Sequence, residues 1–328
     1  MRVNLIGAGK LGLAYAAFMS SRGHTVHCVD NNQELIDKYT SGQFETTEPK
    51  VAELVRLFPM TYSLEPIEAD LTIILVQTPT SYAGYDHSIL EKLLKNFSGP
   101  VILTSTVQPG FCQRYPDVTY NPLFVQIGNV VHNLESTTDV LVGGVTGVHS
   151  DFFNSLYGPD VTIHYMSHIE AEVAKLSLNS YITMKISFAN MIGDAMRRVG
   201  KDADAVLGFV GSDARVGDKC LKYGWGYGGP CFPRDNRALS TFLREYGMYD
   251  YLPMASHESN ERHAMEQALN YKSDTMTDMC YKEGCAVPIT EESHKVKTAL
   301  IIKSFGKNLK INFPPDSLPK ELQPLCQM

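Results

Sequence analysis

One cysteine occupies a position that suits nucleophilic chemistry. Cys231 lies in the segment GYGGPCFPRD, residues 226–235, shortly before a helical pattern that resumes at about Asp235. The positive end of a helix dipole favours the thiolate, which is the reactive form of cysteine. Asp235 can orient a water molecule or a proton transfer, and the glycines are expected to clear space for a bulky ligand. The alternative is a buried structural cysteine, which we expect the other six cysteines to be.

An ammonium group and an amide share one face of a predicted helix. Lys175 and Asn179 are four residues apart in a long helical stretch, so their side chains lie on the same side of it. Together they can stabilise negative charge that develops on an oxygen atom during a reaction. The alternative is a solvated lysine on a helix surface.

A glycine motif near the N-terminus predicts a site for a nucleotide pyrophosphate. Residues 7–12 read GAGKLG, follow a short apolar strand and open a helix. The first glycine permits a tight turn, the second lets the backbone approach the pyrophosphate, and the third lets helix pack on strand. The helix N-terminus also attracts phosphate. The alternative is a strand–helix turn that binds nothing. The residues expected to contact the cofactor are Gly7, Gly9, Lys10, Leu11 and Gly12.

Polar residues at the ends of the following strands extend this prediction. Asp30 ends the next strand, where a carboxylate accepts hydrogen bonds from a ribose 2′-hydroxyl and repels a 2′-phosphate, so NAD is favoured over NADP. The loops QTPT (77–80) and STVQPG (105–110) follow two later strands and are expected to face the nicotinamide. Ordinary turn chemistry is the alternative for both loops. The candidate residues there are Thr78, Pro79 and Thr106.

The first half of the chain predicts an α/β fold. Strand-like runs alternate with helical or polar stretches, which is typical of βαβ units and of a parallel sheet covered on both faces. The predicted strands are 2–6, 25–29, 71–76, 101–103, 118–120 and 140–142, with a helix at 11–22 and a polar or helical stretch at 88–97.

The pattern becomes helical near residue 166. One helix is predicted over 169–198, and helices of that length often connect domains or form dimer interfaces. Another begins after Asp202, a suitable N-cap. Further helical stretches are 235–246 and 252–279, and one strand is predicted at 298–302 within a weakly patterned end.

Composition narrows the class of protein. The chain has 328 residues, with 29 Lys and Arg against 36 Asp and Glu, so it shows no basic excess for nucleic acid. No apolar run approaches the roughly 20 residues of a membrane helix, and we expect no signal peptide. Seven scattered cysteines are typical of reduced thiols in a cytosol-like compartment. No group of His, Cys or acidic residues has the spacing of metal ligands.

These motifs, in this order, resemble the UDP-glucose/GDP-mannose dehydrogenase family, and most closely its members that oxidise UDP-glucose. The resemblance covers about residues 1–265. It is carried by GAGKLG with Asp30, QTPT, STVQPG, Asn121-Pro122, Glu170-Ala171-Glu172 with Lys175 and Asn179, Lys185-Ile186-Ser187-Phe188 with Asn190, Arg215-Val216-Gly217 and GYGGPCFPRD.

The resemblance implies an organisation and an activity. It implies a Rossmann NAD-binding domain (1–165), a long central helix with a helical dimerisation and substrate domain (166–282), and a remnant of a nucleotide-sugar-binding domain (283–328). A family member of this kind is a cytoplasmic homodimer. It uses two NAD to oxidise the C6 alcohol of a nucleotide sugar to a carboxylate, as in the conversion of UDP-glucose to UDP-glucuronate.

The resemblance also implies roles for single residues. Cys231 captures the aldehyde as a thiohemiacetal, which a second oxidation converts to a thioester that water cleaves. Lys175 and Asn179 contact the substrate and stabilise its oxyanions, and Asp235 supports proton transfer. Thr106 lies near the reacting centre. The remaining implied contacts are Arg215, Gly228 and Phe232 with the substrate, Arg215 reaching it across the dimer, and Arg234 with the cofactor.

The sequence departs from the family pattern in three places. Leu123 follows Asn121-Pro122 where the family has a glutamate credited with thioester hydrolysis, Arg234 replaces a lysine, and the C-terminal domain is mostly missing. We therefore expect impaired hydrolysis, with the thioester accumulating or the product stopping at the aldehyde. Two alternatives remain: a non-catalytic descendant that binds NAD, a nucleotide sugar or a partner protein, and one half of a split enzyme.

Overall fold

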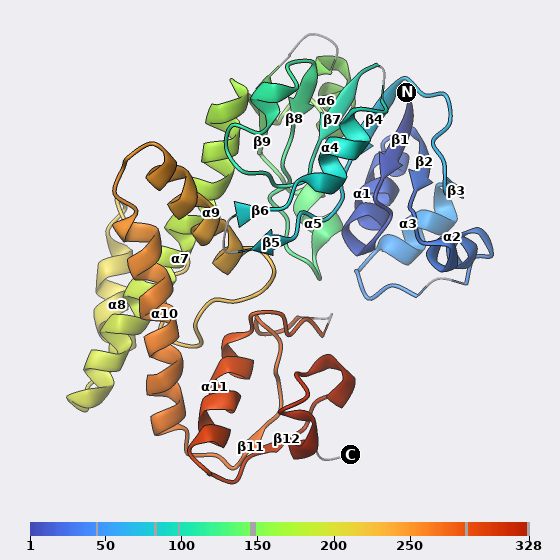
Figure 1. The fold of residues 1–328 in the computed structure, drawn as a ribbon. Coiled ribbons are helices and arrows are strands. Elements are labelled where there is room, and N and C mark those ends of the chain that lie inside the picture. Colours follow the sequence, from blue (N-terminus) through green and yellow to red (C-terminus); the bar gives the residue numbers. More distant parts are fainter. Residues whose placement is uncertain (44, 82–83, 98, 145–148, 286–287, 327–328) are drawn as a thin grey trace. The chain divides into compact units, whose positions relative to one another are not determined.

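The chain forms two compact units, Met1–Lys175 and Leu176–Met328, in the computed structural model (Figure 1). The structure describes residues 1–43, 45–81, 84–97, 99–144, 149–285 and 288–326. Helix α7 (His168–Arg198) begins in the first unit and continues through the second. It is the long helix that the sequence predicted.

The first unit is built on an eight-stranded sheet of order β10-β9-β8-β7-β4-β1-β2-β3. Neighbouring strands are parallel except for the pair β8 and β9. Strand order grows outward from β1 in both directions, as in doubly wound dinucleotide-binding sheets. This confirms the predicted fold class. The strands are β1 (Arg2–Ile6), β2 (Thr25–Val29), β3 (Thr61–Ser63), β4 (Leu71–Ile74), β7 (Val101–Leu103), β8 (Val118–Tyr120), β9 (Asp139–Gly144) and β10 (Thr162–Met166), beside a hairpin of β5 (Thr80–Ser81) and β6 (Gly84–Tyr85).

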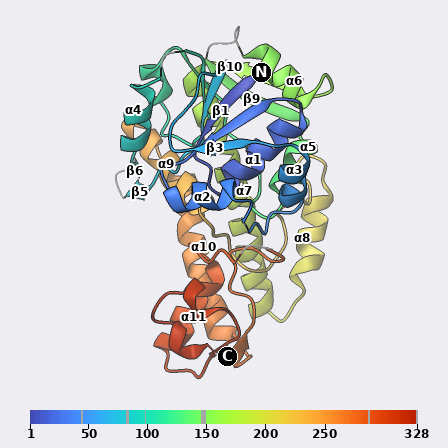
Figure 2. The same cartoon turned by 90° about the vertical axis from the view of Figure 1, so that its right-hand side faces the viewer.

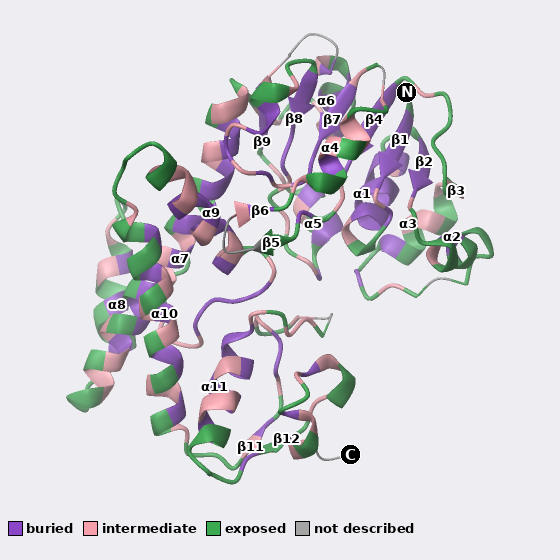
Figure 3. Cartoon of the chain, viewed as in Figure 1, coloured by how far each residue is buried: buried purple, intermediate pink, exposed green. Residues whose placement is uncertain are grey.

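Apolar side chains cover both faces of this sheet, and most of its strands are coloured as buried in Figure 3. Successive strand residues point to opposite faces, so Leu5 joins the cluster that includes α1, whereas Ile6 joins the cluster that includes Leu90 of α4. The helices are α1 (Lys10–Ser21), α2 (Gln33–Thr40), α3 (Val51–Leu57), α4 (Ser88–Leu94), α5 (Val130–Glu135) and α6 (Ser150–Tyr157), with a 3-10 turn at Cys112–Arg114.

The second unit is mainly helical. As predicted, α8 begins after Asp202, whose side chain accepts a hydrogen bond from the backbone N–H of Asp204. Strands β11 and β12 pair in parallel, and α11 connects them along the chain, so the three elements form one βαβ unit. Helix α11 packs beside α10 (Figures 1 and 2). The elements are α8 (Ala203–Ser212), α9 (Phe232–Glu245), α10 (Tyr251–Asn270), β11 (Thr275–Met276), α11 (His294–Ser304) and β12 (Lys310–Ile311), with 3-10 turns at Pro315–Ser317 and Gln323–Leu325.

Two predicted elements in this unit are wrong. Residues 298–302 are helical in α11 because Ser293 caps it and Val296, Ala299 and Ile302 bury one helical face. The helix predicted over 252–279 ends at Asn270, after which the Tyr271 hydroxyl and Ser273 bind the Thr275 carbonyl in a turn that leads into β11. No helix among the described residues is both long and apolar enough to cross a membrane.

Candidate active site

The three glycines of the GAGKLG motif have different structural surroundings. Gly7 has a positive φ of 101°, and a side chain there would overlap the backbone of Leu75. A side chain on Gly12 would overlap the carbonyl oxygen of Gly7 at the start of α1. Gly9 has an ordinary φ of −62°, and a β-carbon there would meet no atom within 4 Å. Neither strain nor internal packing therefore demands glycine at Gly9, whereas the predicted approach of a pyrophosphate would.

The first turn of α1 is prepared for an anion. Gly9 is its N-cap and offers no side-chain hydrogen bond to the helix. The backbone N–H groups of Lys10, Leu11 and Gly12 meet no acceptor among the described residues. They carry the partial positive charge of the helix N-terminus. These groups fit the pyrophosphate of a dinucleotide.

Asp30 is held firmly beside this turn. Its Oδ2 accepts a hydrogen bond of 2.9 Å from the N–H of Ala8, and its Oδ1 accepts one of 3.0 Å from Asn32. The hydroxyl of Tyr39 donates to the Ala8 carbonyl at 2.9 Å, and burial raises the pKa of Tyr39 to about 12. Sequence analysis missed Tyr39, because nothing in a motif thirty residues upstream points to it. These contacts fix the Asp30 carboxylate beside the glycine turn, and its binding to a ribose hydroxyl stays a prediction.

The loops after β4 and β7 are tied to each other. The Thr78 hydroxyl donates to the Thr106 carbonyl at 2.8 Å, and Ser105 bonds both the N–H and the carbonyl of Val76. Because β4 and β7 are adjacent parallel strands, these loops leave the same edge of the sheet. The structure thus brings Thr78 and Thr106 together, while Pro79 is an exposed residue of the same loop. That these residues face the nicotinamide stays a prediction.

Glu172 of α7 anchors the second of these loops. Its carboxylate accepts hydrogen bonds from the backbone N–H of Gly110 at 2.5 Å and of Cys112 at 2.8 Å. The side chain is fully buried, and burial raises the pKa of Glu172. Glu172 belongs to the family-like motif but had no role assigned from sequence. It holds the STVQPG loop onto the helix that carries Lys175.

Lys175 is oriented by the residues that follow Asn121-Pro122. Its Nζ donates to the Leu123 carbonyl at 2.9 Å and stands 4.5 Å from the centre of the Phe124 ring. Only 7% of Lys175 is exposed, and the ring face stabilises its ammonium group. The Leu123 side chain packs against the apolar cluster of the sheet. This segment therefore offers Lys175 a carbonyl and an aromatic ring, and no carboxylate at residue 123.

Cys231 lies at the N-terminus of α9. It is the N-cap residue, it is exposed, and its carbonyl accepts the first helical hydrogen bond from the N–H of Asp235 at 2.8 Å. The helix begins at Phe232, three residues earlier than predicted, because Pro233 suits a first helical turn. A thiol at this position meets the positive end of the helix dipole.

Asn179 and Asp235 are in direct contact inside the second unit. The Asn179 amide donates to Asp235 Oδ2 at 2.6 Å, and Arg234 Nε stands 3.3 Å from Asp235 Oδ1. Asp235 is fully buried, so its carboxylate depends on these partners. One turn further along α7, the Thr183 hydroxyl donates to the side chain of Asn236, the residue after Asp235, at 3.0 Å. The two predicted residues therefore form one hydrogen-bonded pair.

The glycines of the cysteine segment correct one expectation. A side chain on Gly228 would overlap the Glu292 carbonyl, and one on Gly229 would come within 2.5 Å of the Tyr281 ring. The Gly229 N–H also donates to the Glu291 carbonyl at 3.1 Å. These glycines admit the chain's own C-terminal segment, so the space beside them is not cleared for a ligand.

Two other predicted substrate contacts, Arg215 and Phe232, interact with residues that are close to them in the sequence. Arg215 is strongly exposed and pairs with Asp213 at 2.6 Å, and Phe232 makes an edge-to-face contact with Tyr227. The expectation for the remaining cysteines is partly wrong: Cys28, Cys112 and Cys280 are buried, but Cys220 is exposed and the other two are partly so. Among the described residues, no group of three or more His, Cys, Asp or Glu side chains is arranged to hold a metal ion.

Comparison with known proteins agrees with this geometry. The NAD binding domain of the UDP-glucose/GDP-mannose dehydrogenase family matches residues 1–160, and the central domain of the same family matches residues 169–262. NAD is therefore the cofactor of the first unit. The open space at Gly9 and the helix N-terminus that follows it are compatible with the pyrophosphate of NAD.

Two curated relatives and two solved structures show the extent of the likeness. UDP-glucose 6-dehydrogenase YwqF of Bacillus subtilis is 29% identical over 73% of this chain and 61% of its own length, and UDP-glucose 6-dehydrogenase of Pseudomonas aeruginosa is 28% identical over 80% and 66%. The chain spans about six-tenths of the length of such relatives. A UDP-glucose dehydrogenase structure from Pyrobaculum islandicum (TM-score 0.82, 23% identity, 94% of this chain and 80% of that one) shares the fold. So does a UDP-D-ManNAc dehydrogenase from Pyrococcus horikoshii (TM-score 0.79, 24% identity, 95% and 82%).

Proposed function

Because the chain belongs to the UDP-glucose/GDP-mannose dehydrogenase family, we propose that it uses NAD to oxidise the C6 alcohol of a nucleotide sugar, with Cys231 as the nucleophile. The observation that carries the proposal is the exposed thiol at the N-terminus of α9, one turn before the buried Asp235–Asn179 pair. UDP-glucose is the first substrate to test, since several relatives are named for it.

The first unit supplies the residues that would hold NAD. The first turn of α1 would bind the pyrophosphate, Asp30 the ribose, and the loops with Thr78, Pro79 and Thr106 the nicotinamide half. When bound, NAD takes up the hydride that leaves the sugar carbon in each of two oxidations. Repulsion between Asp30 and a 2′-phosphate would disfavour NADP.

The chain's own residues would carry the remaining chemistry. The Cys231 sulfur adds to the aldehyde carbon, and the new alkoxide is stabilised by Lys175 and Asn179. Loss of the second hydride leaves a thioester on Cys231. Water then adds to the thioester carbon, the C–S bond breaks, and the thiolate leaves, while Asp235 supports the proton transfer. We place the substrate against Lys175, Asn179, Arg215 and Phe232.

Leu123 suggests that thioester cleavage is the slow step. The Leu123 side chain packs into the apolar cluster and cannot accept a proton from water. Lys175 is bound by the backbone carbonyl of the same residue. The proposal therefore expects an acyl-enzyme to accumulate. Intact-protein mass spectrometry after mixing with UDP-glucose and NAD should show this adduct, and rapid full turnover to the uronate without an adduct would contradict it.

A panel of nucleotide sugars tests the activity itself. NADH formation is measured for the native protein, Cys231→Ser and Cys220→Ser, since Cys220 is a second exposed cysteine in the same unit. The proposal requires NADH with at least one sugar, its loss in Cys231→Ser and its retention in Cys220→Ser. A protein that binds NAD but forms no NADH with any sugar would instead support the non-catalytic alternative.

We also propose a cytoplasmic homodimer formed through the central helical unit. Apolar side chains of α7 and α8 are exposed in the single chain, among them Tyr181 (54%), Met191 (52%) and Phe209 (81%). Among the described residues none of the seven cysteines forms a disulfide, which suits a reducing compartment. Sedimentation equilibrium of the native protein and of Phe209→Ser tests the dimer, which the substitution should weaken.

A further inference from the structure

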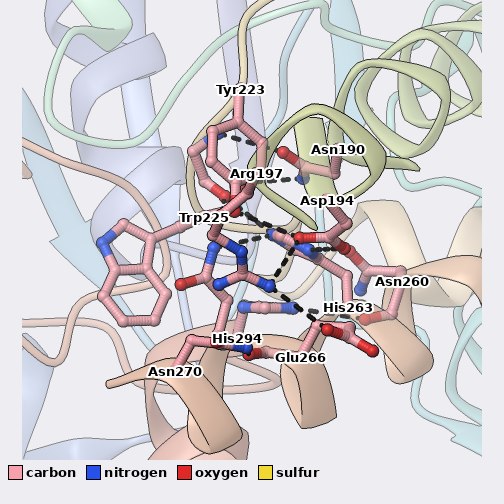
Figure 4. A network of polar contacts seen from close by, with 12 residues as sticks. Asn190, Asp194, Arg197, Tyr223, Trp225, Asn260, His263, Glu266, Asn270 and His294 are labelled. Carbon is pink, nitrogen blue, oxygen red and sulfur yellow. Dashed lines mark hydrogen bonds and ion pairs between the residues drawn. The ribbon is translucent and has the colours of Figure 1, made fainter. Parts of the chain in front are cut away.

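A cluster of polar side chains lies in the second unit, where Asn190, Asn260, His263 and His294 are buried (Figure 4). We call it the histidine cluster. It joins α7 and α10 to the glycine-rich segment before Cys231, and α11 closes it. Its members are Asn190, Asp194, Tyr223, Asn260, His263 and His294.

His263 connects Asp194 to the backbone of the glycine-rich segment. Its Nδ1 lies 2.7 Å from Asp194 Oδ2, and its Nε2 lies 2.8 Å from the Gly224 carbonyl oxygen. Both contacts lead to atoms that only accept hydrogen bonds, and the side-chain amide of Gln267 lies 3.1 Å from the same Nε2. The Tyr223 hydroxyl donates to the other carboxylate oxygen of Asp194 at 3.1 Å. Only 2% of the His263 side chain is exposed.

Two amides bind the same stretch of backbone. Asn260 accepts from the N–H of Tyr227 and donates to its carbonyl, both at 3.0 Å. Asn190 accepts from the N–H of Gly224 at 3.0 Å. The first and last residues of the stretch 224–227 therefore each have both their backbone N–H and their carbonyl oxygen bound by a side chain. Gly226 allows this approach, since a side chain there would overlap Asn260 and His294.

The constraint continues to the thiol. The N–H of Gly229 is bound to the Glu291 carbonyl, and the ring of Pro230 fixes its φ angle. Cys231 then begins α9. Each residue from Gly224 to the thiol is thus either bonded, packed or conformationally restricted.

The cluster does not have the geometry of a metal site. Both nitrogens of His263 are occupied by Asp194 and Gly224. The His263 and His294 rings stack face to face, with centroids 5.1 Å apart and planes 28° apart. The nitrogens therefore do not converge on one point. Burial lowers the pKa of His294 to about 3, so this ring stays neutral against His263 at ordinary pH.

We propose that Asp194, His263 and Asn260 are positioning residues for Cys231, which fix residues 224–227 and thereby hold the thiol at the N-terminus of α9. The proposal rests on the role of Cys231 put forward above. His263 and His294 lie beyond the matched central domain, which ends at residue 262. The cluster thus makes the C-terminal helices part of the machinery that presents the cysteine.

A pair of matched substitutions separates positioning from general stability. His263→Gln keeps a donor near Nε2, facing Gly224, and His263→Asn keeps one near Nδ1, facing Asp194. Each variant removes one half of the same buried ring. Only His263→Asn removes the ring contact to the Gly224 carbonyl, which then keeps the longer contact of 3.3 Å from Gln267.

The readout is the rate at which iodoacetamide alkylates Cys231, measured by peptide mass spectrometry with Cys220 as an exposed internal reference. Because Cys231 is already exposed, loosening the segment should not make the thiol more accessible to iodoacetamide. It should instead move the thiol away from the helix N-terminus that stabilises the thiolate. We expect His263→Asn to slow alkylation of Cys231 by at least about threefold, and His263→Gln by less than about 1.5-fold. Cys220 should react at the native rate in both. After mixing with UDP-glucose and NAD, the rate at which the thioester adduct forms should follow the alkylation rate, while the affinity for NAD stays unchanged.

Equal effects of the two substitutions, or a native alkylation rate in His263→Asn, would overturn the proposal. If His263→Asn does not fold, Tyr223→Phe takes its place, because it removes only the hydroxyl that orients Asp194; a native alkylation rate in that variant is then the contrary result. Alkylation needs neither NAD nor sugar. A protein that forms no NADH yet shows the predicted alkylation pattern would therefore reject the dehydrogenase proposal and leave the positioning proposal standing.

Discussion

Substituting alanine at Gly9 and at Gly12 should separate cofactor binding from stability. A β-carbon on Gly9 meets no protein atom within 4 Å, and the φ angle there is accessible to alanine. A β-carbon on Gly12 overlaps the Gly7 carbonyl oxygen and lies 3.0 Å from the carbonyl carbon. Both are backbone atoms of a tight turn and cannot move aside as a flexible side chain would.

The magnitudes follow from these contacts. Overpacking costs about 1–3 kcal/mol, and the backbone clash places Gly12→Ala at the upper end. For a unit of this size, Met1–Lys175, about 3 kcal/mol corresponds to a melting temperature lower by roughly 6–12 °C. In Gly9→Ala, loss of the glycine N-cap destabilises the folded protein by up to about 1 kcal/mol. Reduced flexibility of the unfolded chain offsets this loss, so the melting temperature should change by no more than roughly 3 °C.

Binding of NAD should show the opposite order. The methyl group of Gly9→Ala occupies the space through which the pyrophosphate approaches, so affinity should fall at least about tenfold, which is about 1.4 kcal/mol. Scanning calorimetry and NAD titration calorimetry on the native protein and both variants measure the two effects. Native NAD affinity in Gly9→Ala would refute the reasoning, as would a native melting temperature in Gly12→Ala.

Three further perturbations test other parts of the structure. Leu123→Glu should remove the accumulated thioester adduct seen by mass spectrometry, whereas the matched Leu123→Gln should not, because only the carboxylate accepts a proton from water; persistence of the adduct in Leu123→Glu would argue against a missing base. Asp30→Asn should lower the NAD-over-NADP affinity ratio at least about tenfold in paired titrations, since the charge that repels a 2′-phosphate is lost; an unchanged ratio would speak against ribose binding at Asp30. Because burial lowers the pKa of His294 from 6.5 to about 3, the unfolded chain binds the extra proton between those values, and the free energy of unfolding of the second unit should fall by up to about 1.4 kcal/mol per pH unit as pH drops below 6.5. His294→Phe should flatten that slope in urea unfolding curves, and an equally steep slope would contradict the assignment.

Much of the first unit could be predicted from the sequence, because its signals are local. The apolar runs at Arg2–Ile6 and Thr25–Val29 are strands as predicted, and GAGKLG sits between β1 and α1. A buried parallel strand needs a continuous apolar run, and a tight strand–helix turn needs glycine. Both requirements act over a few neighbouring residues.

The polar stripe of α7 could also have been found in the sequence. Asn179, Thr183, Ser187 and Asn190 recur at spacings of three and four, and each makes a hydrogen bond within the second unit. Such spacing places side chains on one helical face. What these residues bind, however, belongs to α9, α10 and the glycine-rich segment, and no local rule names those partners.

The C-terminal region depended on tertiary contacts. Residues 298–302 are β-branched and apolar enough to resemble a strand, but burial of Val296, Ala299 and Ile302 against α10 makes them helical. A short apolar run is compatible with either period, so its partner decides.

By itself, then, the sequence determined the dinucleotide-binding sheet, the long helix and the place of Cys231 ahead of a helix, because turn chemistry and hydrophobic periodicity are written into adjacent residues. Only the tertiary structure decided why the segment before Cys231 must be glycine-rich. There, Asn260, Glu292 and His294 approach from more than twenty residues away along the chain. Contacts between distant segments depend on how packed elements meet, and that information is absent from any short stretch of sequence.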